Sequence, residues 1–285
     1  DGSLALQKTV SVGGLGGNPY RDGTYEYYLS EPLRKNDLKG VGPFIFASIE
    51  MEIMEENNLG KGKKVALDYH FNREFRKDWN GQNEQFHYTW EDTFHSGFLW
   101  WGDIFKNYGA KLTAIKDKPT SSNLKGQNVF IIVDPDTKKE TTAPNFMDKT
   151  SIENIKNWVS AGGTLVLMAN DTANCEIPKF NELSKAFGIA FTGKSRNMVQ
   201  GTAWHQGLVD IPAGNQIFKN TQKVYVKELV TLQLSGKAYP IIEEGGDVIM
   251  AATNFGKGRV FVIGDPWLYN EYVGGRRIPK DYQNY

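Results

Sequence analysis

The chain has 285 residues, of which 40% are hydrophobic and 13% aromatic, so it can bury a core and does not have the composition of a disordered protein. Lys plus Arg and Asp plus Glu number 33 each, and this zero net charge argues against a general electrostatic grip on nucleic acid. No run approaches the ~20 apolar residues of a membrane span, and the single cysteine, Cys175, excludes an intramolecular disulfide.

The chain begins with a glycine- and tyrosine-rich stretch. It reads SVGGLGGNPYRDGTYEYYLSE, from Ser11 to Glu31. Pro19 stands where a dinucleotide-binding fingerprint needs glycine, no strand-forming run precedes Gly13, and no GK[ST] follows. The stretch is therefore not a phosphate-binding loop of the usual kind.

A helix is expected next. From Leu38 to Asn57, apolar residues recur at helical spacing, with acidic residues on the other face. Asn36 or Asp37 can cap its start, and Gly60 follows its end. The polar stretch NLGKGKK after this helix marks a change of pattern, and we place a domain boundary between residues 58 and 59.

From Lys64 onward, strands alternate with helices, and after Arg196 the pattern becomes β-rich. This order predicts an α/β fold with a parallel, flavodoxin-like or doubly wound sheet flanked by helices, and a β-rich C-terminal part that adds an antiparallel edge. Thr150 or Ser151 is expected to cap the second of these helices. The expected strands are KKVALDYHFN, AKLTAI, NVFIIVDPD, TLVLMAND, IAF, KVYVKELVTL, AYPIIEE, DVIMAATNF and GRVFVIGDP, and the expected helices are TWEDTFHSGFLWWGDIFKNYG, TSIENIKNWVSAGG and IPKFNELSKAFG.

Polar residues follow the ends of several expected strands. Ligands of open α/β sheets bind beyond the carboxyl ends of parallel strands. Carboxylates and aromatic rings that share a cleft there could hold a cation or bind a sugar. The alternative is that these residues cap helices and shape turns. The candidates for substrate binding are Asp68, His70 and Asn72 after the first strand, Asp134 and Asp136 after the third, Asn170 and Asp171 after the fourth, and Asp265 and Trp267 after the last.

The segment EQFHYTWEDTFHSGFLWW is dense in aromatic residues. Most of it is expected to be core, since a wide aromatic stripe usually packs inside a protein. If part of the segment is exposed as a platform for a sugar ring, Tyr88 and Trp90 are the candidates.

A nucleophile elbow is missing. Asn170 and Asp171 stand where the nucleophile of a Gly-x-Ser-x-Gly or Gly-x-Cys-x-Gly turn would be. Cys175 comes several residues later, without flanking glycines, which indicates a buried thiol. The four histidines have no metal-ligand spacing. We therefore expect no catalytic residue, metal or cofactor in this chain.

The run GGLGGNPYRDGTYEYYLSEPLRKNDLKGVGPFIFASIEME resembles the final loop and last helix of glycoside hydrolase family 105, the unsaturated rhamnogalacturonyl hydrolases, related to the family 88 glucuronyl hydrolases. The resemblance covers about Ser11 to Glu52. It implies that residues 1–58 close an (α/α)6 barrel whose catalytic aspartate lies outside this chain. It also implies a barrel-mouth position, towards substrate, for Tyr20, Arg21, Asp22, Tyr25, Glu26 and Tyr27.

The remainder, residues 59–285, resembles an accessory domain with the layout of class I glutamine amidotransferases but without their nucleophile. The two resemblances together imply a non-catalytic C-terminal region of a polysaccharide-degrading uronyl hydrolase, which binds carbohydrate or assembles with the barrel. One alternative is that the region lends substrate-binding residues to a glycoside hydrolase active site. Another is an independent hydrolase or amidotransferase. The implied partners are a uronic-acid-containing oligosaccharide or polysaccharide and the rest of the barrel, and the implied location is periplasmic or exported.

Overall fold

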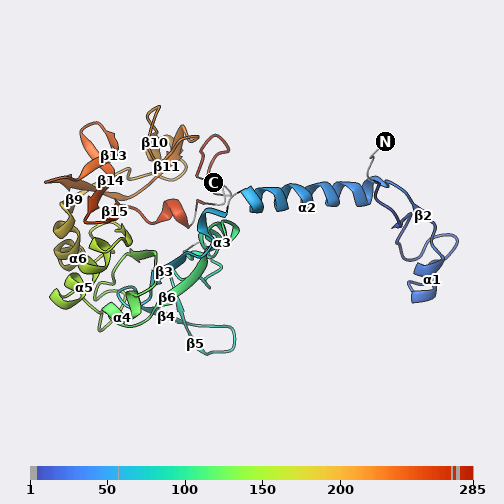
Figure 1. Cartoon of the computed structure of the whole chain (residues 1–285), viewed down its shortest axis with the longest axis horizontal. Helices are drawn as coiled ribbons and strands as arrows, with labels where there is room; N and C mark the ends of the chain where they lie inside the picture. The colour runs from blue at the N-terminus through green and yellow to red at the C-terminus, as the bar shows by residue number, and fades with distance from the viewer. Residues whose placement is uncertain (1–4, 57, 95, 271, 274–276, 285) are drawn as a thin grey trace. The chain divides into compact units, whose positions relative to one another are not determined.

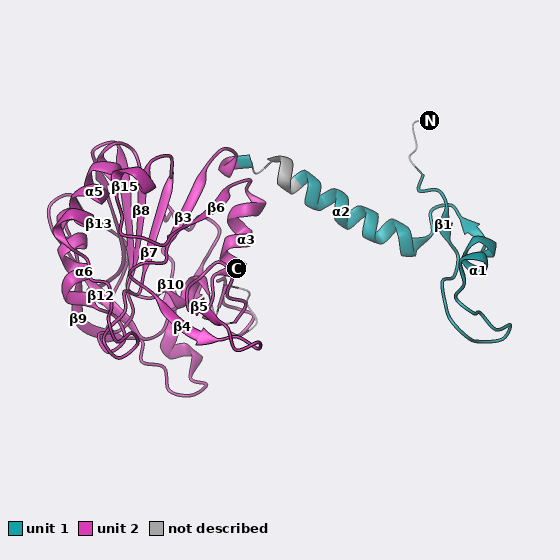
Figure 2. Cartoon of the chain, turned by 90° about the horizontal axis from the view of Figure 1, so that it is seen from below, with its two compact units in different colours: residues 1–58 teal, residues 59–285 magenta. Residues whose placement is uncertain are grey.

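The structure is a computed structural model that describes residues 5–56, 58–94, 96–270, 272–273 and 277–284 (Figure 1). The chain divides into two compact units, Asp1–Asn58 and Leu59–Tyr285 (Figure 2). No helix within the described ranges is long and apolar enough to cross a membrane.

Unit 1 consists of short elements and one long helix. Thr24 caps the first helix by accepting a hydrogen bond from Tyr27 N at 3.2 Å. Asp37 Oδ1 accepts from Lys39 N at 3.0 Å, as expected for a residue before the long helix. The helix predicted from Leu38 is confirmed, although Asn57 lies outside the described residues. The elements are β1 (Thr9–Val10), α1 (Tyr25–Ser30), β2 (Leu33–Arg34) and α2 (Leu38–Glu56).

Unit 2 is built on a sheet of nine strands among its described residues. Strands β6, β3, β7, β8 and β15 are parallel neighbours in that order. Beyond β15 the pairing becomes antiparallel, through β14, β12 and β9, with β13 also paired to β14. The strands are β3 (Lys64–Asp68), β6 (Lys111–Ile115), β7 (Val129–Val133), β8 (Thr164–Met168), β9 (Ile189–Arg196), β12 (Leu229–Leu234), β13 (Tyr239–Glu244), β14 (Asp247–Phe255) and β15 (Gly258–Ile263).

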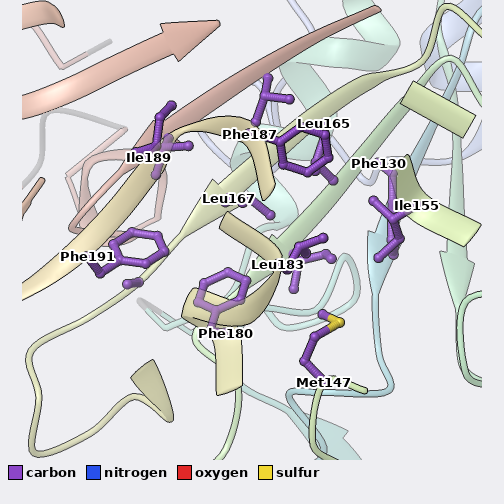
Figure 3. Close-up of a cluster of buried hydrophobic side chains, with 14 of the residues drawn as sticks. Phe130, Met147, Ile155, Leu165, Leu167, Phe180, Leu183, Phe187, Ile189 and Phe191 are labelled. Atoms are coloured by element: carbon purple, nitrogen blue, oxygen red, sulfur yellow. The ribbon is translucent and has the colours of Figure 1, made fainter. Parts of the chain in front are cut away.

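Two apolar cores lie on the two faces of this sheet. In the first, Ile155 and Phe180 from two helices pack against Leu165 and Leu167 of β8, as Figure 3 shows. In the second, Trp101 packs against residues of the opposite sheet face, such as Met168. The mixed α/β fold and the β-rich C-terminal part are therefore confirmed. The helical elements of unit 2 are η1 (Asn58–Gly60), α3 (Leu99–Asn107), α4 (Ser121–Leu124), α5 (Lys149–Ser160), α6 (Ile177–Ser184), η2 (Lys185–Phe187), η3 (Trp204–Gly207) and η4 (Trp267–Tyr269).

Helix α3 is shorter than predicted. The sequence predicts a helix from Thr89 to Gly109, but α3 begins only at Leu99. The Asp92 carboxylate accepts hydrogen bonds from Phe94 N at 3.0 Å and from Ser96 Oγ at 3.1 Å, which stabilise a loop instead. A side chain that bonds its neighbours' backbone competes with helix formation in this way.

The start of α5 also differs from the prediction. Asp148 caps the helix by accepting from Ser151 N at 2.8 Å, so the expected cap at Thr150 or Ser151 was wrong by two or three residues. The expected strand KVYVKELVTL is divided in the structure into a short strand, Lys223–Tyr225, and β12. Two short pairings were not predicted, because their strands are too brief to show an apolar period. They are β4 (Glu74–Lys77) with β5 (Asn83–Phe86), and β10 (Leu208–Asp210) with β11 (Lys223–Tyr225).

Candidate functional site

The ends of the parallel strands bring five of the predicted residues together. Asp68 ends β3, Asp134 and Asp136 follow β7, and Asn170 follows β8, and the carboxyl ends of parallel strands meet at one edge of the sheet. Asn72 joins them by donating from Nδ2 to the Asp134 carbonyl at 2.9 Å. All five side chains are at most 7% exposed. They form a buried polar cluster, which we call the strand-end cluster.

Hydrogen bonds within the strand-end cluster hold two loops against each other. Asp68 Oδ2 accepts from Phe71 N at 2.8 Å, and Asp136 Oδ2 accepts from Arg73 N at 3.0 Å. Asp136 N in turn donates to the Phe71 carbonyl at 2.9 Å. These contacts are those of residues that shape turns, the alternative that the sequence leaves open.

Burial raises the pKa of the strand-end carboxyls, of Asp68 to about 7, of Asp134 to about 8 and of Asp136 to about 6. One oxygen of each of these three carboxyls has no hydrogen-bond partner among the described residues. An acid proton on that oxygen removes the charge that burial disfavours.

The groups that could support catalysis at the strand ends are a metal site and the Cys175 thiol. Among the described residues, no group of three or more His, Cys, Asp or Glu is placed to hold a metal ion. Cys175 is buried, and burial together with the neighbouring Asp134 raises the pKa of its thiol well above the ordinary value. A thiol in that state is a poor nucleophile. A nucleophile elbow would place a strained residue after β8. Here the residue with a strained backbone is Asp134, which follows β7 and has a φ of +43°.

The polar residues that follow β15 lie beside the strand-end cluster. Asp265 is buried and accepts from Trp267 N at 2.7 Å, and burial raises the pKa of Asp265 to about 7. The indole of Trp267 donates to the Tyr88 hydroxyl at 3.2 Å. Burial raises the Tyr88 pKa, and the nearby Asp134 carboxyl adds to the effect. Tyr88 therefore lies between the strand-end cluster and the Asp265 loop.

The remaining predicted residues of unit 2 lie around these buried groups. Tyr88 and Trp90 are at most 6% exposed, so the structure places them in the core and not on a sugar platform. His70 is partly buried, and its carbonyl accepts from Asn145 Nδ2 at 2.9 Å. Asp171 is also partly exposed, and it accepts from Ala173 N at 2.7 Å in a turn.

Two open hollows lie elsewhere on unit 2, and the sequence predicted neither. The first, about 400 Å³, adjoins the β4–β5 hairpin, where Trp79 is 93% exposed. Arg76 in this hollow is paired with Glu84 at 2.6 Å and with Asp92 at 3.4 Å. The pair Asn-Gly in the stretch RKDWNGQNE is a hairpin signal that could have located it. The second, about 490 Å³, lies on a face of the sheet.

The residues assigned to the barrel mouth lie in unit 1. The Arg21 side chain is enclosed by the glycine stretch: its Nε donates to the Gly16 carbonyl at 2.9 Å, and a Cβ added to Gly17 would lie 2.7 Å from its guanidinium. The glycines therefore leave room for Arg21. The others are placed nearby, with Tyr20, Asp22, Tyr25 and Glu26 exposed and Tyr27 hydrogen-bonded to Glu31.

Comparison with known proteins gives a short match in sequence. No family model matches the chain. It is 51% identical over 51 residues to Protein Atu3128 of Agrobacterium fabrum and to the 24.9 kDa protein in the picA locus of Rhizobium radiobacter. These matches cover 17% of this chain and 22% of each relative. The chain thus spans less than a quarter of the length of these curated relatives.

Comparison with solved structures concerns the fold. The N-terminal domain of mmIFT52 is similar with a TM-score of 0.56 at 16% identity, over 74% of this chain and 90% of that domain. At that level of identity the likeness is one of fold. The similar structures also include glycoside hydrolases. One is the β-galactosidase from Rahnella sp. R3, with a TM-score of 0.42 at 15% identity, over 77% of this chain and 32% of the enzyme.

Proposed function

We propose that this chain is the C-terminal accessory region of a polysaccharide-degrading enzyme of the unsaturated uronyl hydrolase type. Unit 1 completes a helical barrel in this proposal. Unit 2 is a domain with the amidotransferase layout that binds carbohydrate and does no chemistry of its own. The proposal includes a periplasmic or exported location, which the resemblance implies.

The observation that carries the proposal is that unit 1 has no core. Among residues 5–52 only Ser11 is buried, and α1 buries none of its side chains. On α2, Phe44, Phe46 and Met51 are between 57% and 70% exposed. Each large apolar side chain left in water forgoes about 1.5–3 kcal/mol of transfer free energy. Unit 1 is therefore expected to pack against another helical domain.

The state of the buried groups supports a non-catalytic unit 2. A nucleophile must reach its substrate as an activated anion or beside a base. Cys175 is buried with a raised pKa, and the strand-end carboxyls are buried with raised pKa values. These groups stabilise loops in the structure, as their hydrogen bonds to Phe71 and Arg73 illustrate.

A second function is favoured by the exposed tyrosines of unit 1. Tyr20 and Tyr25 present most of their surface to solvent, beside the Arg21 that the glycine stretch positions. In a complete barrel these side chains would contribute to binding of an unsaturated uronic acid, with Arg21 near its carboxylate. The region would then be part of a glycoside hydrolase active site whose catalytic residue comes from elsewhere.

The proposal is tested by assaying the chain on unsaturated uronyl disaccharides from pectin and from glycosaminoglycans. We expect no loss of the ultraviolet absorbance of the double bond, because the strand-end carboxyls and the Cys175 thiol are buried. A complete enzyme of the resembled family, assayed in parallel, shows that the substrate is competent. Turnover by the chain at an enzymatic rate, on the order of 1 per second, would overturn the non-catalytic assignment.

A further inference from the structure

The hollow of about 490 Å³ on the sheet face has a floor built from neighbouring strands. Its volume lies in the range of small-molecule sites. Alternate residues of a strand share a face, and cross-strand neighbours lie side by side on it. The register therefore arranges the floor in two parallel rows, one apolar and one polar. We call this hollow the sheet-face pocket.

The apolar row and one wall of the sheet-face pocket are aromatic. Phe261 of β15 is paired with Val166 on one side and with Ala252 on the other, and Ala252 is paired with Tyr239. The wall consists of Trp101 stacked on Tyr269, with ring centroids 4.6 Å apart and planes 18° apart. Trp101 is buried and Tyr269 is partly exposed, so the ring that this wall offers to a ligand is that of Tyr269.

The polar row supplies hydrogen bonds and one charge. Arg259 is paired with Thr164 on one side and with Asn254 on the other. Of the residues that line the pocket, Arg259 alone is charged. Within the described part of the chain, its exposed guanidinium has no hydrogen-bond or ion-pair partner. A guanidinium without a carboxylate partner recognises a carboxylate in a bidentate pair.

A smaller hollow adjoins the sheet-face pocket. It has a volume of about 220 Å³, and both hollows are lined by Gln216 and Tyr239. No charged residue lines this smaller hollow among the described residues. Tyr239 thus stands between two adjoining spaces, an arrangement that suits a ligand of more than one ring.

We propose that the sheet-face pocket binds an acidic oligosaccharide, with a uronate carboxylate on Arg259 and sugar ring faces on Tyr239 and Phe261. This inference rests on the proposed carbohydrate-binding function and gives it a site. The pocket is separate from the strand-end cluster, since Arg259 lies at the amino end of β15, whereas the cluster lies at the carboxyl ends of the parallel strands β3, β7 and β8. Hydroxyl groups of the sugar are matched by Thr164, Asn254 and Gln216.

The test is calorimetric titration of the whole chain with a pectin-derived oligogalacturonate, its methyl-esterified form and benzoate. We expect the acidic sugar to bind, and the esterified sugar and benzoate to bind at least about tenfold more weakly. Arg259→Gln and Tyr239→Ala should each weaken binding of the acidic sugar about tenfold, and Arg259→Lys less. The matched controls are Lys257→Gln, an exposed cation two residues away, and Tyr108→Ala, 39% exposed against 37% for Tyr239.

The outcomes separate the pocket from the proposed function. If the acidic sugar binds and the Arg259 and Tyr239 variants bind as well as their controls, the chain binds carbohydrate elsewhere and the pocket assignment is wrong. If no sugar binds, both the assignment and carbohydrate binding by unit 2 are wrong. Tight binding of benzoate would replace the sugar with an aromatic carboxylate as the occupant. Unchanged thermal unfolding of each variant confirms that the fold is intact.

Discussion

At the scale of single residues, the molecule's distinctive feature is a set of buried aspartic acids at the carboxyl edge of the sheet. Asp68, Asp136 and Asp265 serve as acceptors for backbone N–H groups of the loops, yet burial keeps their pKa values near neutrality. Each folded-state pKa lies above the ordinary value of 3.8. Folding therefore takes up protons at mildly acidic pH, which links stability to pH.

We predict that the free energy of unfolding falls as pH rises from about 4 to about 8. In this window the folded state keeps protons that the unfolded state releases, so each unit of pH favours unfolding. Urea denaturation at several pH values measures the slope. Asp68→Asn keeps an oxygen for Phe71 N and removes the titrating group, so its slope should be shallower. An unchanged slope in this variant would contradict the assignment of the proton to Asp68.

Asp148→Asn is the contrasting variant for that experiment. Burial is the largest single influence on Asp148 and opposes its ionisation, but Lys118 and Ser151 together outweigh it and hold the carboxyl pKa below its ordinary value. The stabilising effect of this carboxylate is present at neutral pH and is lost only as pH falls through its lowered pKa. Its replacement should leave the slope between pH 4 and 8 nearly unchanged.

The sequence predicts which residues gather at the strand ends but not whether their side chains are exposed to solvent. The positions of Asp68, Asp134 and Asn170 follow from parallel strands, which a single sequence reveals by its apolar runs. Their burial depends on the loop 70–73 folding back over them, a tertiary contact with no local signal. Arg259 was missed for the opposite reason, since an isolated surface residue carries no pattern until the sheet aligns it with its neighbours. Trp79 was missed although the Asn-Gly pair beside it is a hairpin signal.

At the scale of elements, the apolar pattern of the sequence predicted the central strands of the sheet best. β7 and β8 are buried on both faces and read as continuous apolar runs, and α5 has a clear cap and a glycine stop. The predicted start of α3 was wrong because Asp92, in the first half of the predicted helix, accepts hydrogen bonds from Phe94 N and Ser96 Oγ. Competition between a side chain and the helical backbone is local but depends on geometry that spacing alone does not reveal.

We predict that Gly97→Ala disrupts the loop before α3. A Cβ at this position would lie 1.9 Å from the Asp92 carbonyl oxygen, so the loop must move. The free energy of unfolding should fall by about 2–3 kcal/mol, the cost of a buried overpacking contact. Chemical denaturation monitored by tryptophan fluorescence gives the value. Gly193→Ala is the control, because no atom lies within 4 Å of the added Cβ, and an equal loss in both variants would refute the steric explanation.

At the scale of the whole molecule, the two units differ in how they are stabilised. The hydrophobic cores consist of unit 2 residues, whereas unit 1 leaves its apolar helix faces exposed. A unit without a core relies on a partner for its fold, since secondary structure alone is marginal in water. Unit 2 has the size and the burial of an independent domain.

We predict that a fragment of residues 59–285 folds alone. Its main denaturation transition should match that of the whole chain, because no core residue is removed. The whole chain should self-associate more strongly than the fragment, through the exposed apolar residues of α2, and sedimentation measures this. Phe46→Lys in the whole chain is the companion variant and should reduce association. A fragment that does not fold would show that unit 2 depends on unit 1.

The position of β15 has a consequence for the newly made chain. Although it is the last strand in sequence, β15 lies in the middle of the sheet, between β8 and β14. Until residues 258–263 leave the ribosome, β8 exposes an open, apolar edge that can pair with any other strand. Strands β13, β14 and β15 are joined by tight hairpins and can assemble locally. We therefore expect the parallel half to be completed late, when this ribbon docks against β8.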